Sequence, residues 1–485
     1  MNRFIAVFKK FPRTFWTANT MELFERWAWY GIFAVFALYL THDKASGALG
    51  FSQTEKGIIM GTGTFLLYLL PVLTGALADR YGFKKILLIS FITLITGYML
   101  LTQVSSFTGV FLVYLLIAIG GSMFKPVIGA TIAKTTDEET SSIGFGLFYM
   151  IVNIGAFIGP LVAAKMRALD WNYVFIVSSA IIALNTILLL LFFKEPSTEA
   201  KGERFITEIK TIGKNILFVI RDWRFALFLI IIAGFWSVYF QLFYSLPVFI
   251  DQWMDTSIAY RAIESISPSI ASAIGTAEGT INPEVLTNID AFYIILLQVL
   301  ISGLVMRFKP LRTMTGGILI MTVGILFMFA FKNPLFLFFS ILLFGIGEMS
   351  TSPKVSEYIG RIAPKGKVAL YMGCSYLPLA IGNLVAGFLS GTLFEHLADK
   401  STLLQSYLDQ HKDLLDGHEI SISSTSDFNL IAEKMSLTPD QLTHLLWREE
   451  QPWKIGVLFA GIGVLAFIAL LLYDRFVTIK KTDQA

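Results

Sequence analysis

Three charged residues interrupt the first long apolar segment of the chain, and their spacing places them together. Glu22, Glu25 and Arg26 lie three and four positions apart, so in a helix they project from roughly one face. A charge near the bilayer centre costs about 2.5–3.5 kcal/mol, so this face must look onto protein or a wet cavity. A surface helix of a soluble protein is the alternative, but Trp27 to Leu38 continue the segment without another charge.

The composition is that of a membrane protein. Of the 485 residues, 55% are hydrophobic and only 15% are charged, whereas soluble proteins carry about 25% charged residues. The net charge of +3 is too small to indicate a nucleic-acid partner. The single cysteine, Cys374, excludes an intrachain disulfide, and we expect no metal site. No nucleophile–base constellation or phosphate-binding loop is present, so the sequence does not favour an enzyme.

Windows of about 20 apolar residues predict an all-α membrane protein with twelve transmembrane helices. Their approximate limits are 16–40, 54–78, 85–104, 108–133, 142–166, 172–193, 224–250, 288–306, 314–331, 334–359, 368–394 and 453–473. Basic residues gather in the connections on one side only, which the positive-inside rule assigns to the cytoplasm. We therefore expect both termini in the cytoplasm and a multi-pass protein in a bacterial inner membrane.

The domain organisation follows from the long connections. We predict an N-terminal six-helix bundle over 1–194 and a C-terminal one over 224–485. A cytoplasmic amphipathic linker over 195–223 joins them, because apolar residues recur there at helical spacing among charges. Two insertions, 251–287 and 397–452, lie on the extracytoplasmic side, and the second predicts a small helical cap.

An internal repeat supports two bundles in the same orientation. Three pairs match at one offset, and a fourth within one residue: Gly120 with Gly347, Pro126 with Pro353, Gly155 with Gly382, and Gly75 with Gly303. In such an arrangement the substrate site lies between the halves, near the membrane midplane.

Two motifs resemble known families. Gly75, Asp79, Arg80 and Gly82, followed by two lysines, resemble the loop signature of the major facilitator superfamily, whose contacts stabilise one gate state. Glu22-x-x-Glu25-Arg26 with Tyr30-Gly31 resembles the first-span motif of the proton-dependent oligopeptide transporter family. Further segments resemble later spans of that family: Gly121 to Pro126, Phe148 to Gly155, Trp236 with Gln241, Gly347-Glu348 with Ser352-Pro353, and Gly382-Asn383.

The resemblance implies a substrate site in the membrane. Its residues here would be Arg26, Tyr30, Tyr68, Lys125, Tyr149, Asn153, Trp236, Gln241 and Glu348. Physically, Arg26 offers a planar fork for a substrate carboxylate, and Glu348 can accept an ammonium group. Lys125 needs a carboxylate partner, for which Glu22 or Glu25 is the candidate; a purely structural ion pair is the alternative.

Coupling to protons is expected to use carboxylates. The candidates are Glu22, Glu25 and Asp290, whereas all five histidines fall in outer loops or at span ends. A proton on Glu22 or Glu25 would free the basic groups for substrate. The energy source would be the proton gradient, with no cofactor.

The chain departs from the family at the outer gate. Family members often carry an arginine where this chain has Phe33, and a glutamate where it has Phe240, as if an aromatic contact had replaced an ion pair. The usual seventh-span acid is thus missing. Asp290 is either its substitute or an interfacial residue. The resemblance implies a monomeric proton-coupled symporter importing di- or tripeptides or related zwitterions; the alternative is a major facilitator transporter of another small organic molecule.

Overall fold

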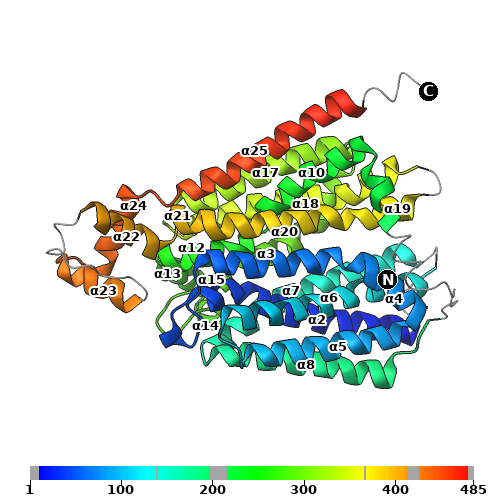
Figure 1. The fold of residues 1–485 in the computed structure, drawn as a ribbon, viewed down its shortest axis with the longest axis horizontal. Helices are drawn as coiled ribbons and strands as arrows, with labels where there is room; N and C mark the ends of the chain where they lie inside the picture. The colour runs from blue at the N-terminus through cyan, green and yellow to red at the C-terminus, as the bar shows by residue number, and fades with distance from the viewer. Residues whose placement is uncertain are drawn as a thin grey trace.

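The computed structural model describes residues 10–137, 140–196, 213–214, 216–364, 367–411 and 425–478, and most of these are helical (Figure 1). Most of the linker predicted over 195–223 lies outside the described residues. The first bundle contains α2 (Arg13–Thr41), α3 (Gln53–Leu69), α4 (Pro71–Tyr81), α5 (Phe83–Leu101), α6 (Phe107–Lys134), α7 (Ser141–Arg167) and α8 (Trp171–Phe192).

The second bundle begins with three consecutive helices in place of one straight span. It contains α10 (Trp223–Tyr239), α11 (Gln241–Tyr244), α12 (Leu246–Trp253), α15 (Pro283–Thr287), α16 (Ile289–Val305), α17 (Pro310–Ala330), α18 (Leu335–Ile362), α19 (Val368–Gly373), α20 (Leu377–Phe388), the π-helix η3 (Leu389–Leu393), α21 (Phe394–Leu397) and α25 (Lys454–Tyr473). The insertions form α13 (Ser257–Ile266), α14 (Pro268–Ile274), α22 (Lys400–Gln410), α23 (Thr425–Lys434) and α24 (Pro439–Glu449), so the predicted helical cap is present.

The twelve predicted spans correspond to these helices. Within the described part of the chain, ten helices are long and apolar enough to cross a membrane, and α3 with α4 makes an eleventh, bent by 44°. The bend falls at Pro71, which has no N–H to continue the helical hydrogen bonding. The remaining span is α2, which has 29 residues but carries buried charges that lower its apolarity.

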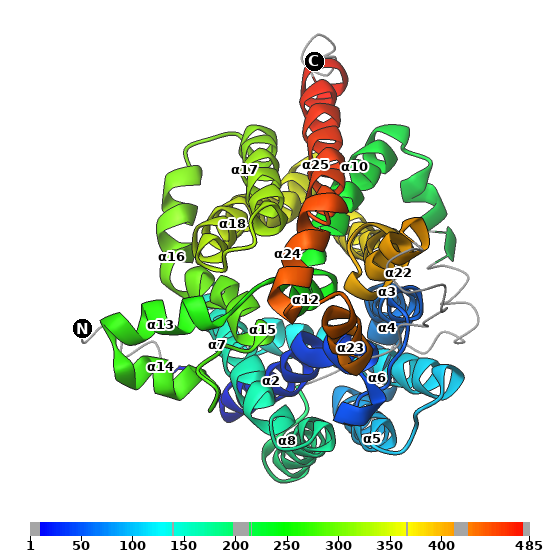
Figure 2. The ribbon, with the colours of Figure 1, turned by 90° about the vertical axis from the view of Figure 1, so that its left-hand side faces the viewer.

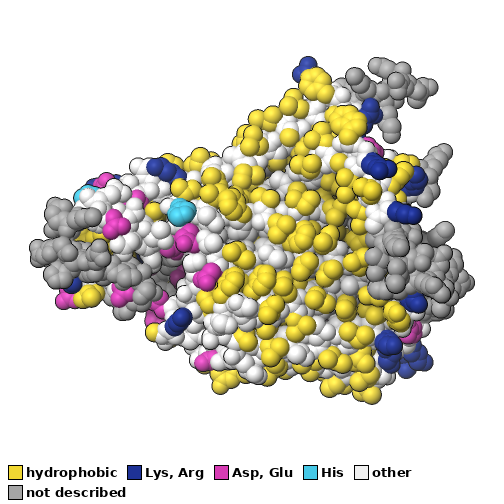
Figure 3. Space-filling model, viewed as in Figure 1, with side chains coloured by type: hydrophobic (Ala, Val, Ile, Leu, Met, Phe, Trp, Pro, Cys, Tyr) yellow, Lys and Arg dark blue, Asp and Glu magenta, His cyan; other side chains and the backbone are white. Residues whose placement is uncertain are grey.

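The surface has a polarity along its long axis. In Figure 3, hydrophobic side chains cover the middle of the molecule, and Lys and Arg gather at the end where the chain termini lie. We call this the terminal end, and the opposite end, formed by α13, α14 and α22–α24, the cap end (Figure 2). The apolar middle is the surface expected of a protein surrounded by lipid.

The two bundles repeat one packing pattern. Gly155 of α7 lies against α2, where an added Cβ would stand 2.8 Å from Cβ of Arg26. Gly382 of α20 lies against α10 in the same way, with an added Cβ 2.6 Å from Cβ of Trp236. Glycine lets each helix pair approach this closely. Trp236 therefore occupies in the second bundle the place that Arg26 occupies in the first.

The bundles are closed against each other at the cap end. Gly57 of α3 touches α20 so closely that an added Cβ would stand 2.2 Å from the carbonyl oxygen of Gly387. Two ion pairs cross the same interface, His42–Asp251 at 3.0 Å and Arg167–Glu284 at 2.6 Å. The structure is therefore a state in which the bundles are closed against each other at the cap end.

A buried lysine completes this closure. Lys56 of α3 is fully buried, and its ammonium donates to the Gln53 side chain (2.7 Å) and to the Tyr244 carbonyl (3.0 Å). Because Tyr244 ends α11, the bond joins the two bundles at the break in the seventh span.

Candidate functional site

The charge cluster of α2 is buried and internally paired. Arg26 Nε lies 2.6 Å from Glu25 Oε2 and 3.4 Å from Glu22 Oε1. The three residues are 4%, 1% and 4% exposed for Glu22, Glu25 and Arg26. The helical spacing predicted this shared face. The guanidinium that could bind a substrate carboxylate is here occupied by two carboxylates of its own helix.

Lys125 does not form the ion pair expected for it. Among the described residues, no carboxylate lies within 4.0 Å of its ammonium, and Nζ stands 4.8 Å from the centre of the Tyr68 ring. The cause is Arg26, which holds both candidate partners, so the lysine is stabilised by the negative face of an aromatic ring instead.

A cavity of about 140 Å³ lies between the bundles. Its wall brings together five of the predicted site residues: Tyr30, Tyr149, Asn153, Asp290 and Glu348. Tyr30 also connects the cavity to the charge cluster, because the Arg26 guanidinium carbon lies 5.9 Å from its ring centre. The sequence reasoning missed several residues of the wall, among them Tyr239, Phe243, Thr287 and Asn288. Aromatic and small polar residues are common in membrane spans for packing alone, so nothing in the sequence marked these four as residues of a binding site.

In the part of the chain that the structure describes, the acidic side of the cavity has no basic partner. Asp290, in the first turn of α16, is 4% exposed, and its Oδ1 has no hydrogen-bond donor. Glu348 of α18 likewise has an unpartnered Oε2. No ion pair within 4.0 Å is formed by either acid among the described residues.

Besides Arg26 and Lys125, three more predicted binding residues lie outside this cavity wall. Tyr68 lies under Lys125, on the first bundle. Trp236 packs its ring 5.0 Å from Tyr239, and its indole nitrogen is buried without a partner. Gln241 is fully buried, donates to the Ser237 carbonyl at 2.9 Å and accepts from the Ser245 hydroxyl at 2.6 Å. In this state the Gln241 side chain joins α10 to Ser245, at the break between α11 and α12.

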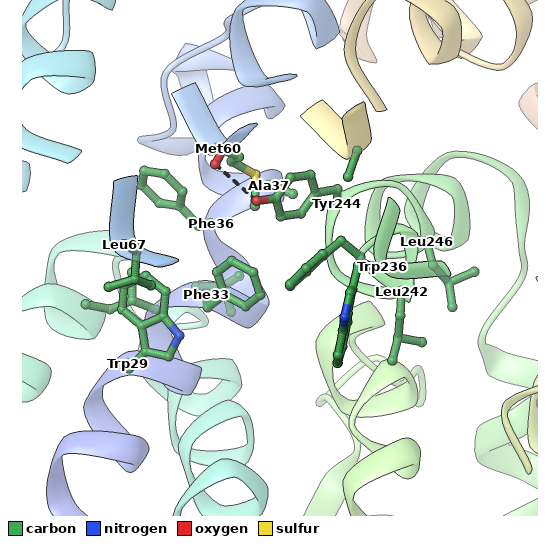
Figure 4. Close-up of a cluster of buried hydrophobic side chains, with 14 of the residues drawn as sticks. Trp29, Phe33, Phe36, Ala37, Met60, Leu67, Trp236, Leu242, Tyr244 and Leu246 are labelled. Carbon is green, nitrogen blue, oxygen red and sulfur yellow. Dashed lines mark hydrogen bonds between the residues drawn. The ribbon is translucent and has the colours of Figure 1, made fainter. Parts of the chain in front are cut away.

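An aromatic cluster stands where the family's outer charge pair would be. The Phe33 ring lies 5.2 Å from Phe243 and 5.9 Å from Tyr244 of the second bundle. The Tyr244 hydroxyl donates toward the Met60 carbonyl at 3.0 Å (Figure 4). Phe240 packs instead against Tyr68, at 6.2 Å. An aromatic contact thus does join the bundles at Phe33, with Phe243 and Tyr244 as its partners.

The signature loop is held within the first bundle. Gly82 adopts φ +92°, a conformation that other residues rarely adopt, so that the chain can turn from α4 into α5. The next backbone N–H, of Phe83, donates to the Glu195 carboxylate, a cap that the sequence did not reveal. Asp79 is exposed at this end, and Arg80 lies over the Tyr81 ring. Gly75 packs near Pro126 of α6.

The arrangement of two bundles around a central cavity agrees with a family comparison. A family model described as "Major Facilitator Superfamily" matches residues 20–281, more than half of the chain. The chain belongs to the Major Facilitator Superfamily. It is therefore a multi-pass membrane transporter and not an enzyme.

Individual relatives and solved structures agree with this superfamily assignment. "Multidrug resistance protein MdtH" of Photorhabdus laumondii is 22% identical over 75% of this chain and 83% of its own length. "Uncharacterized transporter YclF" of Bacillus subtilis is 28% identical over 33% of each chain. A POT family transporter solved in complex with 5-aminolevulinic acid has a TM-score of 0.69 at 18% identity, covering 96% of both chains. The nucleoside transporter NupG has a TM-score of 0.67 at 12% identity, covering 95% of this chain and 99% of its own. These likenesses establish a shared superfamily fold.

Proposed function

We propose that this protein is a proton-coupled symporter that imports di- or tripeptides, or related peptide-like zwitterions, across a bacterial inner membrane by alternating access. The observation that carries the proposal is the cavity between the bundles. Its wall holds the acids Asp290 and Glu348, which have no ion-pair partner among the described residues, and Tyr30, whose ring centre lies 5.9 Å from the Arg26 guanidinium carbon. A zwitterion offers opposite charges to these two sides.

Neighbouring folds support this class of substrate. Among the solved structures with the same fold are a POT family transporter with a thioalcohol conjugated peptide and a peptide transporter POT with alafosfalin. The former has a TM-score of 0.69 and the latter 0.67. We carry peptide-like substrates over to this chain as a proposal, alongside the first-span motif.

Proton coupling follows from the charge cluster of α2. Protonation of Glu25 would remove the negative partner that lies 2.6 Å from Arg26 Nε. The guanidinium, still buried, would then favour a substrate carboxylate as its new partner. Glu22 and Asp290 are the further acids proposed to carry protons. Proton and substrate would thus bind in one state, as symport requires.

The closed cap end fits one step of the transport cycle. In this state, Lys56 and the ion pairs His42–Asp251 and Arg167–Glu284 hold the bundles together at one end. Alternating access requires these contacts to break when the cavity opens to the other side.

Uptake into proteoliposomes with an imposed pH gradient tests the proposal. We expect dipeptides to accumulate when the outside is acidic and to carry protons into the lumen. Glu25→Gln should abolish driven uptake, whereas Asp255→Asn, at an exposed residue away from the cavity, should leave it unchanged. Failure of every dipeptide both to accumulate and to acidify the lumen would refute peptide symport.

A second candidate substrate is a small organic cation. The relatives named for multidrug resistance and the aromatic cavity wall of Tyr30, Tyr149, Tyr239 and Phe243 favour it. Aromatic faces and unpaired carboxylates together bind apolar amines. Transport of such an amine, with no transport of dipeptides, would support this candidate over the first.

A further inference from the structure

Asp290 and Glu348 form a contact between two helices of the second bundle. Both carboxyl groups line the wall of the same cavity, close enough for each to feel the charge of the other, and Tyr239 lines the wall beside them. Asp290 Oδ1 rests on α18 at Gly345, where an added Cβ would stand 2.9 Å from it. Gly345 lies one helical turn before Glu348, so its missing side chain makes the room for this approach.

Apart from the pair itself, the described residues of the cavity wall are uncharged. Facing it are Tyr30 from α2, Tyr149 and Asn153 from α7, Tyr239 from α10, and Asn288 before α16. None of these groups carries a positive charge. Among the described residues, neither acid has a basic partner within 4.0 Å, and one oxygen of each lacks a donor.

Two carboxylates in contact inside a protein cannot both stay ionised, because like charges in a low dielectric repel strongly. The stable arrangement is one proton shared by the two groups, which then titrate as a unit. The first bundle differs, since Arg26 already neutralises part of the charge of Glu22 and Glu25.

We propose that Asp290 and Glu348 form a single proton-sharing carboxyl pair that carries a coupling proton in the second bundle, in place of the acid missing from the seventh span. The proposal rests on the proposed symport and deepens it. The charge that remains on the singly protonated pair then attracts the ammonium group of the substrate in the adjoining cavity.

The charges of this step balance. One proton from the acidic side forms an O–H bond on one carboxylate oxygen, and its hydrogen bond to the other carboxylate leaves the pair with one negative charge. A substrate ammonium brings the site to zero charge, which is the least costly state for the buried site. On the other side, the ammonium and then the proton leave. No carbon bond changes.

Infrared spectroscopy tests the pair without any substrate. We expect pH-difference spectra of the protein in lipid nanodiscs to contain a protonated-carboxyl band that disappears in Asp290→Asn and also in Glu348→Gln. Asp290→Glu should keep a shifted band, and Asp255→Asn should leave the spectrum unchanged. A band that survives unchanged in either single variant would overturn the pair, since a shared proton needs both groups.

Transport gives the second readout. In proteoliposomes, Asp290→Asn should lower proton-driven dipeptide accumulation by about tenfold or more, the size of a typical coupling between sites. Exchange of internal for external dipeptide should continue, because it needs no net proton movement. Undiminished driven accumulation in Asp290→Asn would refute a coupling role. If the infrared band behaves as expected but no dipeptide is transported, the proton pair stands and the peptide substrate fails.

Discussion

The two bundles of this transporter pack by one pattern but place their charges on different helices. Arg26 on α2 and Trp236 on α10 occupy equivalent places, each beside a glycine of the neighbouring helix. The first bundle thus has its acids on its first span, whereas the corresponding span of the second is aromatic. The acids of the second bundle lie instead on α16 and α18.

The difference is also one of pairing. In the first bundle two acids share one guanidinium, and Lys125 lies over an aromatic ring nearby. In the second bundle Asp290 and Glu348 have no cation among the described residues. A buried charge without a partner is costly. The buried acids of the first bundle are therefore largely neutralised by residues of that bundle. The acids of the second bundle need a proton or a cationic ligand to be neutralised.

The largest expected effect comes from breaking the ion pairs of the charge cluster on α2. Arg26→Met leaves Glu22 and Glu25 buried without their cation, and removing one partner of a buried pair costs about 3–5 kcal/mol. We expect a large loss of thermal stability in detergent, measured by fluorescence-detected unfolding, and no uptake.

The matched control removes the acids as well. The triple variant Glu22→Gln, Glu25→Gln, Arg26→Met has no unpaired charge on α2, so its stability should return while uptake stays absent. A single Arg26→Met variant as stable as the native protein would show that the cluster is not the closed ion-pair network described above.

Lys125→Ala gives the next effect, because Lys125 is a basic residue of the first bundle that pairs with no carboxylate among the described residues. If this ammonium binds the substrate carboxylate, the lost charge-assisted interaction is worth about 1.5–3 kcal/mol, or about 10–100-fold in apparent affinity. The apparent KM for dipeptide uptake measures it. Lys125→Arg keeps the charge and should lose less; equal KM values for Lys125→Ala and the native protein would reduce Lys125 to a packing residue.

Much of the fold could be predicted from the sequence, because its signals are local. Apolar windows gave the twelve spans, and spacing alone gave the shared face of Glu22, Glu25 and Arg26. The repeat of Gly155 and Gly382 predicted two similar halves, and both glycines do lie at close contacts between helices. The spans and the shared face depend only on residues near each other in one helix, and the glycine contacts depend on a small residue where two helices approach closely.

The pairing of side chains across the site could not be read in the same way. Lys125 was expected to meet an acid of α2, but Arg26 lies on the same helix turn and holds both. The contact of Asp290 with Glu348 depends on how α16 crosses α18 at Gly345, which no local pattern encodes. Gln241 looks like a binding residue by position, yet its amide is used within the backbone break.

A third prediction concerns the closed cap end and its dependence on pH. Burial would lower the pKa of His42, but the Asp251 carboxylate 3.0 Å away outweighs burial and raises it; Arg167 opposes and Glu284 assists. With a raised pKa, the ion pair contributes fully below the ordinary value of about 6.5 and is lost as the pH rises through the raised value. We therefore expect acid to favour cap-end closure, by about 1 kcal/mol for one partly exposed pair.

Double electron–electron resonance measures this closure as the distance between spin labels placed at Ala45 and Glu264, in a Cys374→Ser background. The closed population should fall as the pH is raised, and His42→Gln should remove most of the pH dependence. An unchanged pH dependence in His42→Gln would assign the effect to other groups, and a closed population that grows with pH would contradict the sign.

The last expected effect, a change of a few fold, tests how the Tyr68 ring stabilises Lys125 in the first bundle. The Tyr68 ring lies 4.8 Å from Lys125 Nζ, and such a contact is worth about 0.5–2 kcal/mol depending on burial. Tyr68→Phe keeps the ring face and should change the apparent KM little, whereas Tyr68→Leu removes it and should raise KM by a few fold. In a Lys125→Ala background the two Tyr68 variants should become equal, because the ring then has no cation to hold. If Tyr68→Phe were as damaging as Tyr68→Leu, the hydroxyl and not the ring would matter. Tyr68 would then act through its hydroxyl group, and the lysine of the first bundle would lack a partner just as the acids of the second bundle do.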